Sequence, residues 1–272
     1  MYKEYYHLKE NPFNITADPD FFFSSAQHRE AITHLIYGIQ QRKGIIAITG
    51  EIGTGKTTLC RTVLSKLDDT IKTALILNPN FSDLQLLRLI LQDLGIKSNA
   101  RSKYEMIDAL NEFLLEETNS GNNVVLIIDE AQNLKVNQLE QIRLLSNLET
   151  EKEKLLQIVL VGQPELIDKL KLNSLRQLNQ RITVRFHIGS LSIDEMKEYV
   201  RHRMKIAQNS DFTRYSIHFT DDAFQSIFDI SKGTPRMVNI LCDRALLAGY
   251  AAETFTIDQN IIHRCSREVG QK

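Results

Sequence analysis

An apolar run that leads into a glycine-rich loop constrains this chain more than any other feature. Residues 45–49 have the pattern of a buried strand, residues 50–57 follow as Gly-x-x-x-x-Gly-Lys-Thr, and residues 58–64 have helical character. A strand, a glycine loop and a helix in this order form a loop that wraps around phosphate groups. The glycines let backbone N–H groups converge on a ligand, and the start of the helix adds partial positive charge. We therefore expect a phosphate-binding site here.

The loop predicts a set of nucleotide contacts. Lys56 is expected to contact the β- and γ-phosphates, and the Thr57 hydroxyl to ligate Mg²⁺. The predicted nucleotide-binding residues of this segment are Gly50, Glu51, Ile52, Gly53, Thr54, Gly55, Lys56, Thr57 and Thr58.

Short β-branched runs alternate with long amphipathic stretches over the first part of the chain. Strands are predicted at residues 45–48, 73–77, 124–128, 157–161 and 183–186. Four of these runs lack apolar/polar alternation, so both faces of those strands are expected to be buried, as in a parallel sheet between helical layers. The sequence thus predicts a three-layer α/β domain.

The pattern changes after about Gly189. Only helices are predicted beyond this point, at residues 192–208, 220–231, 235–251 and 258–268. Ser192 with Glu195 has the spacing of a capping box, and Pro235 suits a first helical turn. We expect an α/β domain over residues 1–189 and a small all-helical domain over residues 190–272.

Two carboxylates directly follow the most apolar strand. Asp129 and Glu130 come after residues 124–128, at the strand edge where open α/β sheets bind ligands. Asp129 is expected to hold Mg²⁺, and Glu130 to orient and deprotonate an attacking water. The alternative is a solvated pair in a turn, but an acidic pair that ends an apolar strand favours ATP hydrolysis over nucleotide binding alone.

Composition excludes several classes of protein. The 33 basic and 34 acidic side chains leave a net charge of −1, so no global basic field attracts nucleic acid. Cys60, Cys242 and Cys265 match no metal-binding spacing, and reduced thiols in a cytosolic protein are expected. No signal peptide and no apolar run of ~20 residues is present, so a cytoplasmic chain without a membrane span is predicted.

Further motifs lie outside the phosphate loop. They comprise Tyr-Tyr-His-Leu-Lys-Glu-Asn-Pro-Phe at 5–13, Asp-Pro at 18–19, Phe-Phe at 21–22, His-Arg-Glu-Ala at 28–31, Leu-Ile-Tyr-Gly-Ile at 35–39, Ile-Ile-Asp-Glu-Ala-Gln at 127–132, Val-Gly-Gln-Pro-Glu-Leu at 161–166 and Leu-Arg-Gln-Leu-Asn-Gln-Arg at 175–181. Together with the loop and the acidic pair, they resemble AAA+ ATPases, specifically the ExeA/GspA type of the general secretion pathway. The resemblance covers nearly the whole chain and implies a P-loop NTPase core followed by a helical AAA+ lid.

The resemblance also implies roles for single residues. Gln163, after the strand at 157–161, matches the sensor 1 position, and Arg236 matches the sensor 2 arginine of the lid, which contacts the nucleotide phosphates. Arg181 matches an arginine finger that reaches the ATP of a neighbouring subunit, with Arg176 and Arg185 as rivals. Residues 11–28 match the segment that surrounds the adenine. For Gln163, Arg236 and Arg181, ordinary loop or surface roles remain the alternatives.

The resemblance favours an oligomeric, Mg²⁺-dependent ATPase that acts on a protein partner of a secretion or pilus-type envelope assembly. It implies a cytoplasmic location, or a peripheral one at the inner membrane through a partner. Many such proteins continue into a membrane segment and a peptidoglycan-binding domain, whereas this sequence ends just after the last predicted lid helix. It is therefore expected to be either a short family member or a truncation of a longer membrane-anchored protein, and direct cell-wall contact by this chain is not expected. The alternatives are a DNA-binding transposition regulator of the TnsC, TniB or MuB type, and a nucleotide-regulated switch with little turnover.

Overall fold

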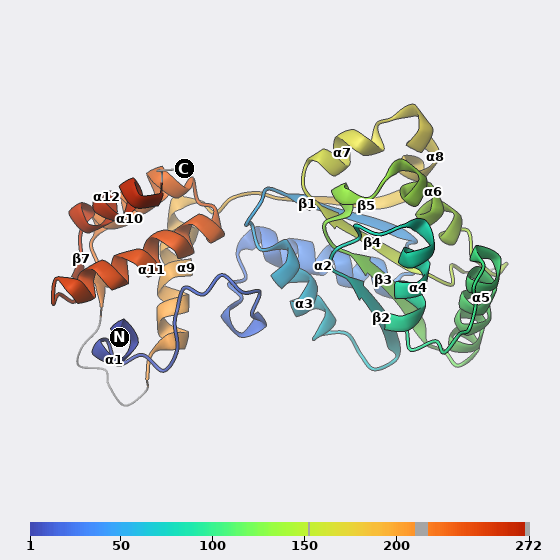
Figure 1. Cartoon of the computed structure of the whole chain (residues 1–272), viewed down its shortest axis with the longest axis horizontal. Helices are drawn as coiled ribbons and strands as arrows, with labels where there is room; N and C mark the ends of the chain where they lie inside the picture. The colour runs from blue at the N-terminus through green and yellow to red at the C-terminus, as the bar shows by residue number, and fades with distance from the viewer. Residues whose placement is uncertain (152, 210–216, 270–272) are drawn as a thin grey trace. The chain divides into compact units, whose positions relative to one another are not determined.

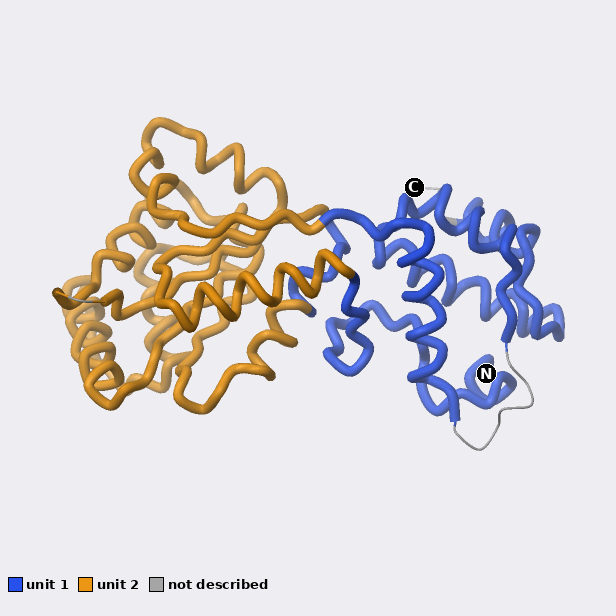
Figure 2. Tube along the Cα trace, turned by 180° about the vertical axis from the view of Figure 1, so that it is seen from behind, with its two compact units in different colours: residues 1–25, 52–58, 189–272 blue, residues 26–51, 59–188 orange. Residues whose placement is uncertain are grey.

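The computed structural model describes residues 1–151, 153–209 and 217–269. Contacts divide the chain into two compact units (Figure 2). The helical unit contains Met1–Ser25, Ile52–Thr58 and Gly189–Lys272, and the sheet unit contains Ala26–Glu51 and Leu59–Ile188. The first 25 residues and residues 52–58 of the glycine loop are therefore grouped with the C-terminal helices by their contacts, whereas the division into residues 1–189 and 190–272 stays a prediction.

The sheet unit is built on five parallel strands in the order β2-β3-β4-β1-β5 (Figure 1). The strands are β1 (Ile45–Gly50), β2 (Ile71–Ile76), β3 (Asn123–Ile128), β4 (Gln157–Gly162) and β5 (Ile182–Ile188). Every residue of β1, β3 and β4 is buried, because these three strands lie inside the sheet and both of their faces are covered. The predicted parallel α/β fold is confirmed.

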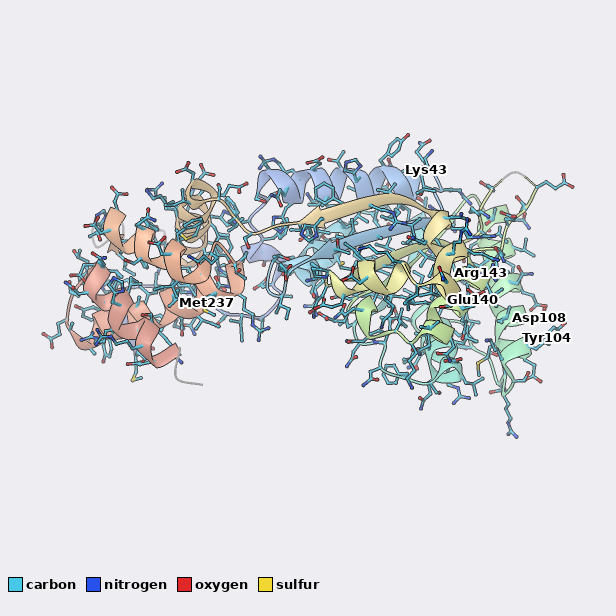
Figure 3. All side chains as sticks on the ribbon, turned by 90° about the horizontal axis from the view of Figure 1, so that it is seen from above. Lys43, Tyr104, Asp108, Glu140, Arg143 and Met237 are labelled. Atoms are coloured by element: carbon cyan, nitrogen blue, oxygen red, sulfur yellow. The ribbon has the colours of Figure 1, made fainter. Side chains whose placement is uncertain are left out.

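Seven helices of the described chain belong wholly or mainly to the sheet unit. They are α2 (Ala26–Gln40), α3 (Lys56–Leu64), α4 (Asp83–Asp93), α5 (Lys103–Asn119), α6 (Val136–Leu145), α7 (Glu165–Leu170) and α8 (Arg176–Arg181). Helix α5 shows how an amphipathic sequence orients itself: Met106, Leu110 and Leu114 are buried in the core. Tyr104 and Asp108 lie one turn apart on its exposed face (Figure 3). The spacing of four residues places each set on one side of the helix.

The helical unit contains the four helices that the sequence predicts after Gly189. They are α9 (Ile193–Ala207), α10 (Asp221–Ser231), α11 (Pro235–Ala251) and α12 (Gln259–Val269). Ser192 and Glu195 form the predicted capping box of α9, and Pro235 occupies the first turn of α11. The expectation of helices only needs one correction, since two short strands, β6 (His218–Phe219) and β7 (Thr256–Ile257), pair in parallel.

The N-terminal segment packs within the helical unit. It contains α1 (Tyr2–Tyr5) and a short 3₁₀ turn, η1 (Pro19–Phe21). The buried Tyr6 hydroxyl lies 3.2 Å from the Leu246 carbonyl oxygen and 3.0 Å from that of Thr254. Tyr6 thus joins the start of the chain to the end of α11 and the turn that follows it.

The three cysteines are free thiols, and all are buried: Cys60, Cys242 and Cys265. Among the described helices, none combines the length and the apolar character that crossing a bilayer requires.

Candidate nucleotide site

Three of the predicted site segments begin at the carboxyl ends of strands in the sheet unit. Asp129 follows β3, Gln163 follows β4, and the glycine loop begins at Gly50, the last residue of β1. Strand β4 is paired with both β3 and β1, and all three strands are parallel. Their carboxyl ends therefore meet at one edge, the position where sheets of this type bind ligands.

The glycine loop has the strand, loop and helix context that its sequence predicts. It connects the end of β1 to α3, whose first residue is Lys56, and the Lys56 side chain is buried. Gly53 has φ +81°, a left-handed conformation that residues with a Cβ rarely adopt. Glycine at this position lets the loop take that conformation without strain.

Gly53 also makes a close backbone contact inside the helical unit. The Arg236 N–H at the start of α11 donates to the Gly53 carbonyl oxygen at 3.2 Å. A Cβ at Gly53 would lie 2.5 Å from the Arg236 Cβ, closer than two carbons can approach. Only glycine therefore lets the loop and α11 meet in this way, while the exposed Arg236 side chain stays available for a ligand.

The acidic pair adopts an uncommon backbone conformation. Asp129 is buried, and its Oδ1 accepts the Glu130 N–H at 2.9 Å. Glu130 has φ +52°, a left-handed conformation that costs about 1–2 kcal/mol for a residue with a Cβ. A second 3₁₀ turn, η2 (Ala131–Asn133), follows at once. The chain therefore turns sharply after β3 and brings Glu130 to the sheet edge half-exposed.

Two glutamine side chains converge on the Glu130 carboxylate. Gln163, the predicted sensor residue, donates from Nε2 to Glu130 Oε2 at 3.2 Å. Gln132 donates from Nε2 to the same oxygen at 2.5 Å. The structure thus brings Gln163 and Glu130 together, as predicted, and adds Gln132. The sequence assigned Gln132 no role, because its contact with Glu130 depends on the left-handed turn at residue 130.

The candidate arginine fingers lie at other places in the sheet unit. Arg181 ends α8 and immediately precedes β5, whose first residue pairs with Ile45 at the start of β1. It is therefore at the amino edge, away from the site of its own chain. Arg185 Nη2 donates to the carbonyl and side-chain oxygens of Asn179 at 2.6 and 2.7 Å, which occupies that guanidinium.

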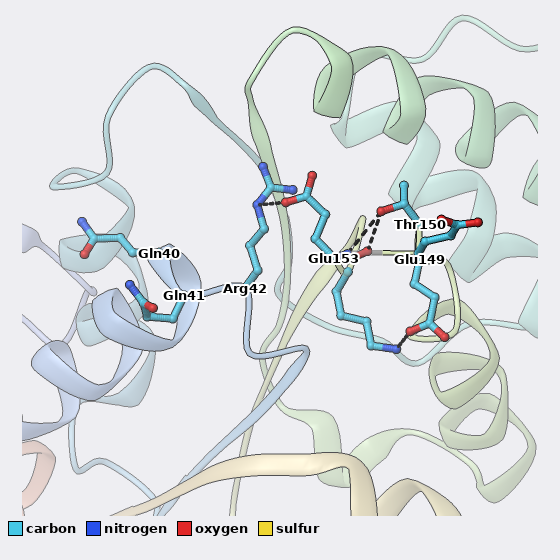
Figure 4. Close-up of a pocket in the computed structure, with 8 residues that line it drawn as sticks. Gln40, Gln41, Arg42, Glu149, Thr150 and Glu153 are labelled. Atoms are coloured by element: carbon cyan, nitrogen blue, oxygen red, sulfur yellow. Dashed lines mark hydrogen bonds and ion pairs between the residues drawn. The ribbon is translucent and has the colours of Figure 1, made fainter.

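A large polar cavity also lies at the amino edge (Figure 4). It measures about 750 Å³ and is lined by Gln40, Gln41, Arg42, Glu149, Thr150, Glu151, Glu153 and Lys154. Arg42 Nε lies 3.3 Å from Glu153 Oε2, and Lys154 pairs with Glu149. The hydrogen bond and charge of Lys154, with a smaller contribution from Arg181, lower the pKa of Glu149.

The described residues contain no metal site formed by protein side chains alone. No group of three or more His, Cys, Asp or Glu side chains there is arranged to hold a metal ion. A magnesium site of the predicted kind uses one hydroxyl, one carboxylate, phosphate oxygens and water, so it does not depend on such a group.

Comparisons with known proteins place these features in a family. A family model described as an AAA domain matches residues 39–170, from the end of α2 through α7. The General secretion pathway protein A of Aeromonas hydrophila is 40% identical over 271 residues, which cover 99% of this chain and 49% of that protein. The chain is thus related to the GspA-type AAA ATPases.

The chain spans about half the length of the curated relative that it matches. Its fold is similar to that of Cdc6p from Pyrobaculum aerophilum, with a TM-score of 0.70, 18% identity, and coverage of 98% of this chain and 71% of that one.

Two further solved structures share the fold. The ORC2 protein of Aeropyrum pernix has a TM-score of 0.70 at 14% identity, covering 97% of this chain and 72% of that one. The RuvB branch migration motor of Thermotoga maritima has a TM-score of 0.58 at 18% identity, covering 90% and 70%. The predicted P-loop fold with an AAA-type lid is thus confirmed, and at these identities the likeness concerns the fold alone.

Proposed function

We propose that this chain binds ATP with Mg²⁺ at residues 50–58 and hydrolyses it to ADP and phosphate. The observation that carries the proposal is the carboxylate of Glu130 at the carboxyl end of β3, with the Gln163 amide from the adjacent strand 3.2 Å from its Oε2. A carboxylate and an amide at the edge where a phosphate loop begins can hold and activate a water molecule.

The loop supplies binding and the acidic strand supplies the metal ligand. Backbone N–H groups of residues 50–58 and the Lys56 ammonium would bind the phosphates. The Thr57 hydroxyl and the buried Asp129 carboxylate are hard oxygen donors, the type that Mg²⁺ prefers. Bound Mg²⁺ would neutralise the charge that develops on the β- and γ-phosphates.

Glu130 is the proposed general base. It takes a proton from the attacking water while the water oxygen bonds to the γ-phosphorus and the bond from that phosphorus to the bridging oxygen breaks, which releases ADP. Gln163 orients the water or the γ-phosphate. Arg236 contacts the phosphates from the start of α11, the turn that meets the glycine loop at Gly53.

A neighbouring subunit completes the proposed site. Arg181 ends α8 at the amino end of β5, away from the acidic pair of its own chain, and we propose that it reaches the ATP of another copy. An arginine supplied in this way contributes about 10³–10⁵ to the rate. The protein is thus proposed to be a homo-oligomer with ATP at its subunit interfaces.

The proposed cellular role follows from the similarity to a general secretion pathway protein. Hydrolysis would act on a protein partner in an envelope assembly, from the cytoplasm or from the inner membrane surface through that partner. This step rests on analogy, since the fold alone does not determine a partner. The net charge of −1 does not favour the alternative of a DNA-bound transposition regulator.

The site is tested by measuring nucleotide binding and phosphate release. The proteins compared are wild type, Lys56→Ala and Asp129→Asn. Wild type is expected to bind ATP and to release phosphate only with Mg²⁺. Lys56→Ala is expected to lose binding, and Asp129→Asn to lose the Mg²⁺-dependent rate. The exposed Lys66, just past α3, gives the matched control Lys66→Ala, which is expected to behave as wild type. Retention of the wild-type rate by Lys56→Ala would remove the proposal.

The class of partner has a separate test. A gel-shift series across salt concentrations, with and without ATP, is expected to show no DNA binding even at low salt. ATP-stimulated binding that weakens steeply as salt rises would instead favour the transposition-regulator function.

A further inference from the structure

The two oxygens of the Glu130 carboxylate have different surroundings. Oε2 accepts two hydrogen bonds, from Gln132 Nε2 at 2.5 Å and from Gln163 Nε2 at 3.2 Å. Oε1 accepts none from the residues that the structure describes. One oxygen is therefore fixed by the protein, whereas the other is left for a ligand or water.

Gln132 is itself held at both ends. Its Oε1 accepts the backbone N–H of Gln163 at 3.0 Å, so its amide joins the turn after β3 to the end of β4. The backbone carbonyl oxygen of Gln132 accepts a hydrogen bond from the Lys169 ammonium on α7. The same ammonium donates to the Leu134 carbonyl oxygen at 2.8 Å. Lys169 thus fixes the backbone of the turn that carries Gln132.

The space around Gln132 is closed by Gly162, the last residue of β4. A Cβ at Gly162 would lie 2.8 Å from Gln132 Oε1 and 3.2 Å from the Gln132 nitrogen. The side chain therefore packs directly on the backbone of β4. A side chain with so few positions open to it can hold a neighbouring carboxylate in one orientation at a low entropy cost.

We propose that Gln132 is a positioning residue for hydrolysis, which holds Glu130 by Oε2 so that Oε1 is the oxygen that takes the proton from water. Lys169 supports it by fixing the turn. The inference rests on the proposed function, because it assigns an orientation to the proposed base. Gln163 keeps its proposed role toward the γ-phosphate, and Gln132 gives Glu130 Oε2 a second donor that does not depend on Gln163.

Two isosteric substitutions separate the hydrogen bonds of Gln132. Gln132→Met keeps the volume but removes both bonds. Gln132→Glu keeps the acceptor for the Gln163 N–H but replaces the donor to Glu130 by a second carboxylate, which repels it. Lys169→Met tests the support from α7 without changing Gln132. Asn133→Ala, an exposed residue of the same turn, is the matched control.

Steady-state hydrolysis, ATP affinity and thermal unfolding are measured for each variant. A positioned general base contributes about 10²–10⁴ to a rate, so we expect kcat to fall ~10- to 100-fold in Gln132→Met, and further in Gln132→Glu. KM, ATP affinity and Tm are expected to stay near wild type, and Lys169→Met to lower kcat by a smaller factor. Asn133→Ala is expected to leave all four quantities unchanged.

Three results would overturn the inference. The first is a wild-type kcat in Gln132→Met. The second is a rise in kcat, which would show that the contact inhibits hydrolysis. The third is a fall in ATP affinity and Tm in parallel with kcat, which would show that the contact serves only to stabilise the structure. Failure of the proposed function is seen separately, in wild-type protein that does not hydrolyse ATP or in Glu130→Gln that still does.

Discussion

Two glycines of the candidate site are defined by what lies next to them. Gly162 leaves room for the Gln132 amide, and Gly53 leaves room for the first turn of α11. At each position a Cβ would meet atoms that belong to another segment at less than 3.0 Å. Gly53 occupies one of the variable positions of the Gly-x-x-x-x-Gly-Lys-Thr pattern, so its glycine is explained by the contact with α11 and not by the pattern itself.

The close contact at Gly53 gives the first prediction. Gly53→Ala is expected to lower the free energy of unfolding by more than the ~1–2 kcal/mol of left-handed strain and to weaken ATP binding at least ~10-fold. Gly121 is a matched control, because it has φ +80° but no neighbour within 4 Å of an added Cβ. Urea unfolding and ATP titration of both alanine variants measure the difference. Equal effects of Gly53→Ala and Gly121→Ala on unfolding would contradict the contact.

His202 on α9 gives a prediction about pH. Burial lowers the pKa of His202 from its ordinary value of 6.5, and its Nε2 is buried with no hydrogen-bond partner among the described residues. Above pH 6.5 the imidazole is neutral in both the folded and the unfolded chain. Below it, the unfolded chain gains a proton that the folded chain does not, so stability falls as the pH falls.

Urea unfolding between pH 7.5 and about pH 5 measures this effect. His202→Gln is expected to flatten the loss of stability toward low pH, whereas His263→Gln, at an exposed position of α12, keeps it. Identical pH profiles for wild type and His202→Gln would contradict the role of burial at this residue.

Some site residues follow from sequence and others do not. The loop, Asp129 and Glu130 were predictable, because each follows an apolar strand directly and the carboxyl ends of parallel strands share an edge. Gln132 was not, because its role depends on a left-handed Glu130 and on contact with Gly162, which comes from a distant part of the chain. For the loop, Asp129 and Glu130 this concerns position, and the roles of all the site residues, Gln163, Arg181 and Arg236 included, stay predictions.

Helix α9 holds the N-terminal segment within the helical unit through hydrogen bonds. Arg203 is buried, and its guanidinium donates to the Pro12 carbonyl at 2.5 Å, the Asn14 carbonyl at 3.0 Å and the Tyr199 hydroxyl at 2.9 Å. The Tyr199 hydroxyl in turn donates to Asn239 on α11 at 2.8 Å. One arginine thus links the N-terminal segment to two helices.

Removal of this arginine is expected to loosen the N-terminal segment. Arg203→Met should lower the free energy of unfolding by about 3 kcal/mol, since it leaves buried oxygens without a donor. Hydrogen exchange of residues 8–23 should become faster. Lys205→Met, on the exposed side of the same helix, is the control and is expected to change neither. Unchanged exchange in Arg203→Met would show that other contacts hold the segment.

The elements show where sequence patterns lose power. The five core strands and four C-terminal helices were predictable, because their apolar periodicity extends over several residues. Strands β6 and β7 were not, since each has only two residues and their pairing joins positions 218 and 256. The grouping of Met1–Ser25 with the C-terminal helices depends likewise on long-range contacts such as Arg203 with Pro12.

For the whole molecule, we expect the nucleotide site to be shared between copies of the chain. Arg181→Ala alone is expected to lose about 10³ in hydrolysis rate, and so is Glu130→Gln. A mixture of the two should recover activity, because a Glu130→Gln subunit supplies Arg181 to an intact Glu130 on its neighbour. Arg176→Ala is the comparison. A wild-type rate for Arg181→Ala alone would show that another arginine, or none, is the finger.

The central claim is that Glu130 turns nucleotide binding into hydrolysis. Phosphate release and ATP affinity, measured on the same preparations of wild type and Glu130→Gln with Mg²⁺ present, test it most directly. Glu130→Gln is expected to bind ATP as tightly as wild type, while its rate of phosphate release falls by about 10²–10⁴. Equal rates of phosphate release in the two proteins would contradict it.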